Sequence, residues 1–138
     1  MSQENVELAR RSIDALNRRD LDAYLALMDD DVEAISRLTA IEGAYRGHDG
    51  IRRWWRTLFD IWPDFTAEVA EMNPFGDVTL GTGRLRGRGA GSDIPWEWSV
   101  HAVGRWQRGK CVWWGNFETR QEALEAAGLS EQDAHADS

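Results

Sequence analysis

Residues that could perform metal or nucleophilic chemistry are few and widely separated in this chain. The three histidines, His48, His101 and His135, and the single cysteine, Cys111, lack the close pairwise spacing of a zinc site. No glycine-rich loop joins a strand to a helix as phosphate-binding loops do, and no serine has a base in a recognisable arrangement. The sequence therefore predicts no metal and no cofactor, and carboxylates are the remaining candidates for acid–base chemistry.

Tryptophan is the unusual residue type, with eight copies in 138 residues. A domain of this size needs few such large side chains to fill its core, so the number favours a cavity with aromatic walls. Burial in an ordinary hydrophobic core is the alternative interpretation for each ring.

Size and charge limit the possible classes of protein. A chain of 138 residues corresponds to one domain, and its net charge of −8 disfavours nucleic-acid binding, which depends on Lys and Arg. The lone Cys111 cannot form an internal disulfide, which favours a reducing, cytoplasmic setting. No signal peptide or apolar stretch of membrane-spanning length is recognisable, so we expect no membrane association.

The elements that must position these residues follow from hydrophobic periodicity. Helical spacing predicts a first helix that ends near 17–19, a second that is capped by Asp20, and a third that is stopped by Pro63. A short strand is predicted between the second and third helices, and alternation predicts later strands that are joined by hairpin turns. A closing helix should end at Gly128. The predicted strands are 32–36, 65–72, 78–88, 94–106 and 110–118, with turns at 73–77, 89–93 and 107–110 and the last helix at 120–127.

Four segments in this order resemble the SnoaL-like branch of the nuclear transport factor 2-like (NTF2-like) superfamily: 15–22, 32–33, 42–51 and 122–129. The resemblance implies an α+β cone, in which a curved antiparallel sheet wraps around a long helix beside N-terminal helices. The resemblance implies a ligand cavity inside the cone and a homodimer that forms through the sheet, and from the sequence we expect a single domain over 1–129 with a disordered tail at 130–138. Because the superfamily includes cyclases, isomerases, dehydratases and members without known activity, the fold does not define a reaction.

The ketosteroid isomerases of this superfamily use an Asp base with a Tyr and a protonated Asp as oxyanion donors. Alignment of the matching segments places Ala34 at the base position, Ser12 at the Tyr position and Ala102 at the position of the protonated Asp, with His101 at this last position if the hairpin is aligned without a gap. The resemblance therefore does not extend to that mechanism.

The same alignment implies which side chains line the cavity. It places Trp114, Asn116 and Glu118 on the inward face of the last strand. Trp98 of the neighbouring strand, and Trp55 and Phe59 of the long helix, complete the predicted ligand-binding wall. Gly81 and Gly83 would leave room for a flat ligand against the sheet.

Glu118 is the first candidate for a catalytic acid or base, because tryptophan walls would raise the pKa of a carboxylate towards neutrality. A position at the rim, or an ion pair with Arg120, is the alternative for Glu118. Glu33 is the second candidate, and it replaces Glu118 if the strand register differs by one residue.

Two functions are consistent with these residues. The first is binding of a small apolar, aromatic or polycyclic molecule in the cavity, with acid–base catalysis of a cyclase, isomerase or dehydratase type as an extension. The second is a non-catalytic dimeric module in which the tryptophans fill the cavity themselves. The volume of the cavity distinguishes the two.

Overall fold

The chain begins with two helices, as its apolar periodicity predicts. The computed structural model describes residues 2–36, 43–88 and 94–130. Helix α1 covers Ser2–Asn17 and helix α2 covers Leu21–Ala26. The Asp20 side chain accepts a hydrogen bond of 3.1 Å from the backbone N–H of Ala23, so the predicted cap of α2 is confirmed.

The long helix α4 covers Gly47–Ile61 and buries one apolar stripe that includes Ile51 and Leu58. It ends at Trp62, immediately before Pro63, whose ring cannot continue a helix. No helix in the described part of the chain combines the length and the apolar character needed to cross a bilayer.

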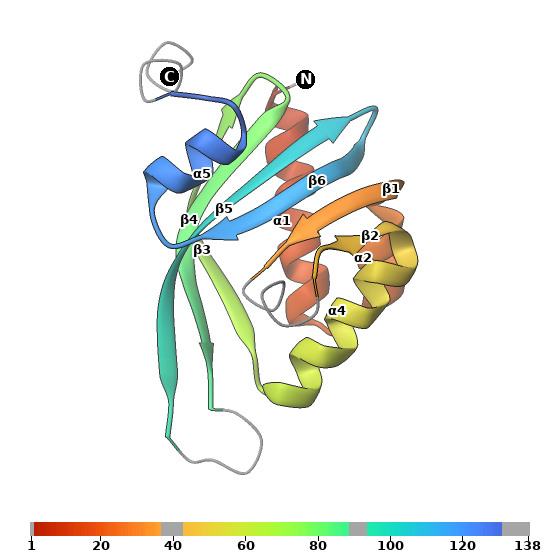
Figure 1. Ribbon diagram of the computed structural model, residues 1–138, viewed down its shortest axis with the longest axis vertical. Coiled ribbons are helices and arrows are strands. Elements are labelled where there is room, and N and C mark those ends of the chain that lie inside the picture. Colours follow the sequence, from red (N-terminus) through yellow and green to blue (C-terminus); the bar gives the residue numbers. More distant parts are fainter. Residues whose placement is uncertain (1, 37–42, 89–93, 131–138) are drawn as a thin grey trace.

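Six strands form one curved sheet in the order β2-β1-β6-β5-β4-β3 (Figure 1). Strands β3 to β6 form an antiparallel meander, as the hairpin pattern predicts. The strands are β1 (Met28–Ile35), β2 (Tyr45–Arg46), β3 (Thr66–Phe75), β4 (Val78–Gly87), β5 (Trp96–Gln107) and β6 (Lys110–Phe117).

One pairing differs from the expected antiparallel sheet, because β1 lies parallel to β6. The strand β1 also begins at Met28, earlier than predicted, since Met28 pairs with Cys111 and the Cys111 N–H donates to the Leu27 carbonyl at 2.8 Å. Periodicity within one segment contains no information on this pairing, because the two strands are distant in the sequence.

Two hairpin turns can be compared with their predictions. At 107–110 the turn is confirmed, with Arg108 and Gly109 both at positive φ, which suits a tight hairpin. At 73–77 the turn is shorter than expected, because β3 continues to Phe75 and pairs there with Val78. The predicted turn at 89–93 and the predicted disordered tail from 131 onward lie outside the described residues.

The two faces of the sheet carry separate cores. Helices α1, α2 and α4 cover one face, and α5 (Arg120–Ala126) covers the other beside β5 and β6 (Figure 1). The alternation predicted for β5 is confirmed near its end, since Val100 and Trp106 face the first set of helices whereas Val103 packs with the α5 core. Tryptophans of β6 divide in the same way, with Trp114 on the helix side and Trp113 on the α5 side.

Candidate functional site

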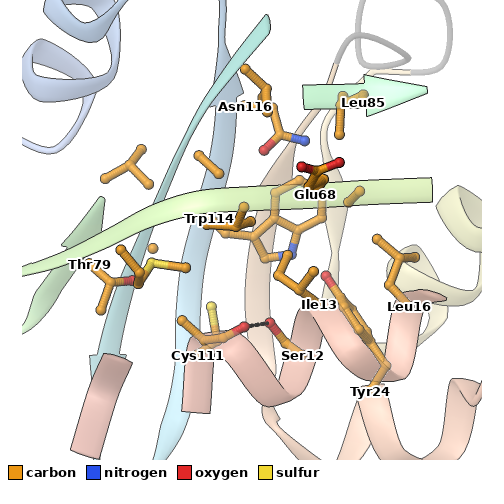
Figure 2. Close-up of a pocket in the computed structure, with 18 of the residues that line it drawn as sticks. Ser12, Ile13, Leu16, Tyr24, Glu68, Thr79, Leu85, Cys111, Trp114 and Asn116 are labelled. Carbon is orange, nitrogen blue, oxygen red and sulfur yellow. Dashed lines mark hydrogen bonds between the residues drawn. The ribbon is translucent and has the colours of Figure 1, made fainter. Parts of the chain in front are cut away.

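A cavity of about 90 Å³ lies between the helices and the concave face of the sheet. Side chains of α1, α2 and α4 form one side, and strands β3 to β6 form the other (Figure 2). An apolar cavity of about 150 Å³ can hold benzene, whereas drug-sized ligands occupy about 300–1,000 Å³. The cavity is therefore smaller than one that holds benzene, so a ligand of one small ring would also occupy its opening towards the surface.

Three aromatic rings from three different elements form one wall of the cavity. Trp54 of α4 meets Trp114 of β6 edge to face, with 4.9 Å between ring centroids, and Tyr24 of α2 lies 5.8 Å from Trp54. Edge contacts of this kind stabilise aromatic pairs beyond simple burial. We call Tyr24, Trp54 and Trp114 the cavity cluster.

The hydrogen-bonding groups of the cavity fall into two classes. Ser12 and Thr79 are satisfied within the protein, since Ser12 Oγ donates to the Ala9 carbonyl at 2.6 Å and Thr79 Oγ1 accepts from Trp106 Nε1 at 3.0 Å. Trp114 Nε1, by contrast, is buried and has no partner among the described residues. Buried donors without partners are rare in proteins, and this N–H is free to bond an acceptor in the cavity.

Tyr24 and Cys111 are the buried titratable groups of the cavity wall, and burial keeps both neutral. Burial raises the pKa of the Tyr24 phenol well above its usual range, and the neighbouring Cys111 adds a smaller effect in the same direction. Burial raises the pKa of the Cys111 thiol to about 12, against a smaller opposing effect of a backbone hydrogen bond with Trp113. Neither group acts as a base or nucleophile near neutral pH, but the Tyr24 hydroxyl can donate a hydrogen bond.

Glu68 of β3 is the one carboxylate among the described residues that line the cavity. Its side chain is 62% exposed and forms an ion pair of 2.9 Å with Arg86, so it lies where the cavity reaches the surface. In the view of Figure 2, Glu68 and Asn116 lie at the end of the cavity away from Tyr24 and Ser12. The arrangement combines a buried apolar end, where hydrogen-bond donors lie, with an ionic entrance.

The predicted ligand-binding residues lie in three places: on the cavity wall, behind that wall, and, for Trp98, at the other end of β5. Trp114 and Asn116 line the cavity. Trp55 and Phe59 lie behind it, where Trp55 packs against Tyr24 at 5.3 Å and against Phe59 at 5.2 Å between centroids. Trp54, which the sequence analysis did not include in the predicted wall, is the tryptophan of α4 that lines the cavity.

Trp98 lies in a second aromatic group at the other end of β5. Its ring contacts Trp62, which follows α4, with centroids 5.7 Å apart, and Trp96 at 4.5 Å. We call Trp62, Trp96 and Trp98 the rim cluster. These half-buried rings do not line the cavity.

Both predicted catalytic carboxylates lie away from the cavity wall. Glu33 alternates with Val32 and Ala34, which are fully buried, and its carboxylate forms an ion pair of 3.1 Å with Arg46. Glu118 is exposed, because β6 ends at Phe117 and the chain turns towards Thr119, the N-cap of α5. The alternation that places Trp114 and Asn116 inward therefore stops one step before Glu118.

The space beside Gly81 and Gly83 is filled by atoms of the protein itself, although the sequence analysis predicted that a flat ligand would lie there. A Cβ at Gly81 would lie 3.0 Å from the terminal methyl of Met72, so the Met72 thioether fills the space. A Cβ at Gly83 would overlap the backbone carbonyl of Glu68. Neighbouring strand β3, which has an irregular register after Val69, thus occupies both positions.

His48 and His101 have structural partners. The His48 ring donates from Nε2 to the Met28 carbonyl at 2.9 Å. His101 lies 3.4 Å from Thr82 Oγ1, and burial, followed by the charge of Arg120, lowers its pKa. Within the described ranges, no group of three or more His, Cys, Asp or Glu side chains could hold a metal ion.

Comparison with known proteins identifies the family. The family model described as a SnoaL-like domain matches residues 9–114, which include all of the described cavity-lining residues except Asn116. This chain belongs to the SnoaL-like family. No curated protein matches the sequence of this SnoaL-like chain.

Solved structures show that the SnoaL-like chain has the NTF2-like fold. An NTF2-like protein of unknown function from Burkholderia pseudomallei K96243 has 21% sequence identity and a TM-score of 0.76, covering 88% of this chain and 95% of that chain. An uncharacterized cystatin-fold protein from Novosphingobium aromaticivorans has 26% identity and a TM-score of 0.67, covering 85% and 98%. A protein from Jannaschia sp. CCS1 with the provisional name SnoaL-like polyketide cyclase has 19% identity and a TM-score of 0.69, covering 84% and 85%.

Sequence reasoning missed Tyr24, Trp54 and Glu68 as cavity residues. Tyr24 and Trp54 lie on the apolar stripes of their helices, so periodicity could show that they are buried but not that they border a space. Glu68 alternates with apolar neighbours in β3, and the twist of the sheet brings it to the entrance.

Proposed function

We propose that this protein binds a small, largely apolar molecule of about one ring in the cavity of its cone. The observation that carries the proposal is the cavity of about 90 Å³, which has aromatic walls and contains a buried N–H of Trp114 without a partner. A core that existed only for stability would close such a space, because unfilled volume costs stability. The provisional name of the Jannaschia protein, a polyketide cyclase, is consistent with a cyclic apolar ligand.

Titration with aromatic compounds of increasing size tests this proposal, with intrinsic tryptophan fluorescence as the readout. Toluene and acetophenone should quench the fluorescence at saturation, whereas anthraquinone should not, because three fused rings exceed the cavity. Ala102→Leu fills the cavity from β5 and should weaken the binding of toluene at least about tenfold. Ala126→Leu, on the exposed side of α5, is the matched control and should bind normally.

Two results would contradict the binding function. Absence of binding for every single-ring compound would favour the alternative, a non-catalytic module in which Trp54 and Trp114 fill the cone. Equal affinity in wild type and in Ala102→Leu, with native near-ultraviolet circular dichroism, would place the ligand elsewhere. The homodimer predicted through the sheet is a separate proposal, which sedimentation equilibrium tests directly.

Acid–base catalysis is the finer part of the proposal. The roles of Glu118 and Glu33 stay predictions, and Glu68 joins them because it borders the cavity. Glutamine at Glu33 or Glu118 should change the affinity for toluene by no more than about twofold, as expected for surface substitutions. A turnover assay on any bound cyclic ketone, with the glutamine variants of Glu33, Glu68 and Glu118 side by side, then identifies the carboxylate that carries the proton.

A further inference from the structure

We propose that the ligand presents a neutral carbonyl oxygen to the buried end of the cavity, where the Trp114 indole N–H and the Tyr24 hydroxyl donate hydrogen bonds to it. This inference rests on the proposed binding function and specifies the class of ligand. A ketone, aldehyde or quinone with a compact ring fits the description.

The first observation is the orientation of Trp114. Its side chain is only 9% exposed, its Nε1 has no partner in the described part of the chain, and the indole borders the cavity. Figure 2 shows the indole extending from β6 across the cavity, with its nitrogen on the side of Ile13 and Tyr24. An indole N–H can only donate, so an acceptor is required to satisfy it.

The indole N–H groups of Trp106 and Trp96 have different surroundings from that of Trp114. Trp106 borders the same cavity, but its Nε1 donates to Thr79, so the fold satisfies an indole where it can. Trp96 also has a buried Nε1 without a partner, yet its ring lies against the backbone of Gly87, where a Cβ would be 3.1 Å from that nitrogen. The N–H of Trp114 differs from that of Trp106 because it has no partner, and from that of Trp96 because it borders the mainly apolar cavity, whereas Trp96 borders an open groove lined by charged side chains.

Tyr24 supplies a second donor from a different element. Its side chain is 5% exposed and borders the cavity, and no hydrogen bond to its hydroxyl is found among the described residues. In Figure 2 the Tyr24 ring projects from α2 with its hydroxyl directed into the cavity. A hydroxyl that remains protonated is able to donate to a ligand oxygen over the whole physiological range of pH.

Charge considerations make the acceptor a neutral one. Arg84 is the one cation among the described residues on the cavity wall, and it is exposed and bonded to Glu97 at 2.9 Å. A carboxylate at the buried end would lose its hydration without gaining a counter-charge, which is strongly unfavourable. A carbonyl oxygen needs only hydrogen-bond donors, and Trp114 and Tyr24 supply two.

Acetophenone and α-methylstyrene provide the test, because they differ only by the exchange of C=O for C=CH₂. Binding is measured on ¹⁵N-labelled protein, in which Trp114→Phe identifies the indole resonance of Trp114. Acetophenone should move that N–H proton downfield and bind about 5- to 100-fold more tightly than α-methylstyrene, which leaves the donors unpaired. Tyr24→Phe should remove at least about fivefold of this preference, because it removes one of the two donors.

Trp113→Phe is the matched control, since Trp113 lies next in sequence but packs on the α5 face. This variant should keep the full preference for acetophenone. Equal affinity for the two compounds, or tighter binding of benzoate than of acetophenone, would overturn the carbonyl inference while the binding function stands. Failure of both neutral compounds to bind would overturn the binding function itself and the inference with it.

Discussion

The cavity cluster and the rim cluster contain similar rings in similar geometry, yet only the cavity cluster borders the cavity between the helices and the sheet. Centroids in the cavity cluster are 4.9 and 5.8 Å apart, and those in the rim cluster are 4.5 to 5.7 Å apart. The difference lies in what covers the rings. Three helices cover the cavity cluster, whereas Trp96 of the rim cluster packs on Gly87 and the three rim rings are only partly buried. Aromatic content therefore does not identify a site without the surrounding backbone.

The largest expected difference between the clusters is in stability. Trp54→Ala should lower the free energy of unfolding by about 3–5 kcal/mol, because Trp54 is 4% exposed and its loss leaves a buried void. Trp98→Ala should cost about 1–2 kcal/mol, since its ring is half exposed. Urea denaturation of both variants measures the two values, and equal losses would show that the rim cluster belongs to the core.

Gly81 lies beside Met72 and Gly87 beside Trp96, so alanine at each glycine tests how rigid that neighbouring side chain is. Gly87→Ala should cost about 1–3 kcal/mol, because the new Cβ would lie 2.9 Å from the rigid indole of Trp96. Gly81→Ala should cost less than about 1 kcal/mol, because its closest neighbour is the flexible end of Met72. Thermal unfolding ranks the pair, and the reverse order would mean that Met72 is held more firmly than Trp96.

Met72 should also set the size limit of the cavity. Met72→Ala removes the thioether that fills the space beside Gly81 and should raise the affinity for the bicyclic ketone 1-tetralone about tenfold, or 1.4 kcal/mol. Calorimetric titration measures the affinity, and Trp98→Phe in the rim cluster should leave it unchanged. If 1-tetralone gains nothing from Met72→Ala, another side chain limits the cavity.

The smallest expected effect is a pH dependence of stability that involves Tyr24 of the cavity cluster but no residue of the rim cluster. The pKa of Cys111 rises from 9.0 to about 12 on folding, and that of Tyr24 rises as well, so the unfolded state loses these protons first. Stability should therefore fall as pH increases above about 9, and the Tyr24 part should reach about 1 kcal/mol at pH 10.5. Tyr24→Phe should recover that part in denaturation at pH 8 and 10.5, whereas Trp98→Phe should follow wild type.

The sequence predicts the face of the sheet on which a strand residue lies more accurately than the distance of that residue from the cavity along the strand. Trp98 and Trp106 share a face of β5, but at about 3.3 Å per residue they lie roughly 25 Å apart, so only one of them can border a small cavity. Helices α1, α2 and α4 were predictable because caps, Pro63 and apolar stripes are local signals. The parallel pairing of β1 with β6 and the placement of Met72 beside Gly81 were not, because both depend on strand neighbours.

The parallel pairing of β1 with β6 affects the order in which the protein can assemble. Residues near the start of the chain, such as Met28, pair with residues near its end, such as Cys111. Contacts between distant segments form slowly, because the chain must first lose the entropy of closing the loop between them. Synthesis must therefore reach β6 before Trp114 can close the aromatic wall, so the ability to hold a ligand depends on a contact between distant segments that forms late in folding.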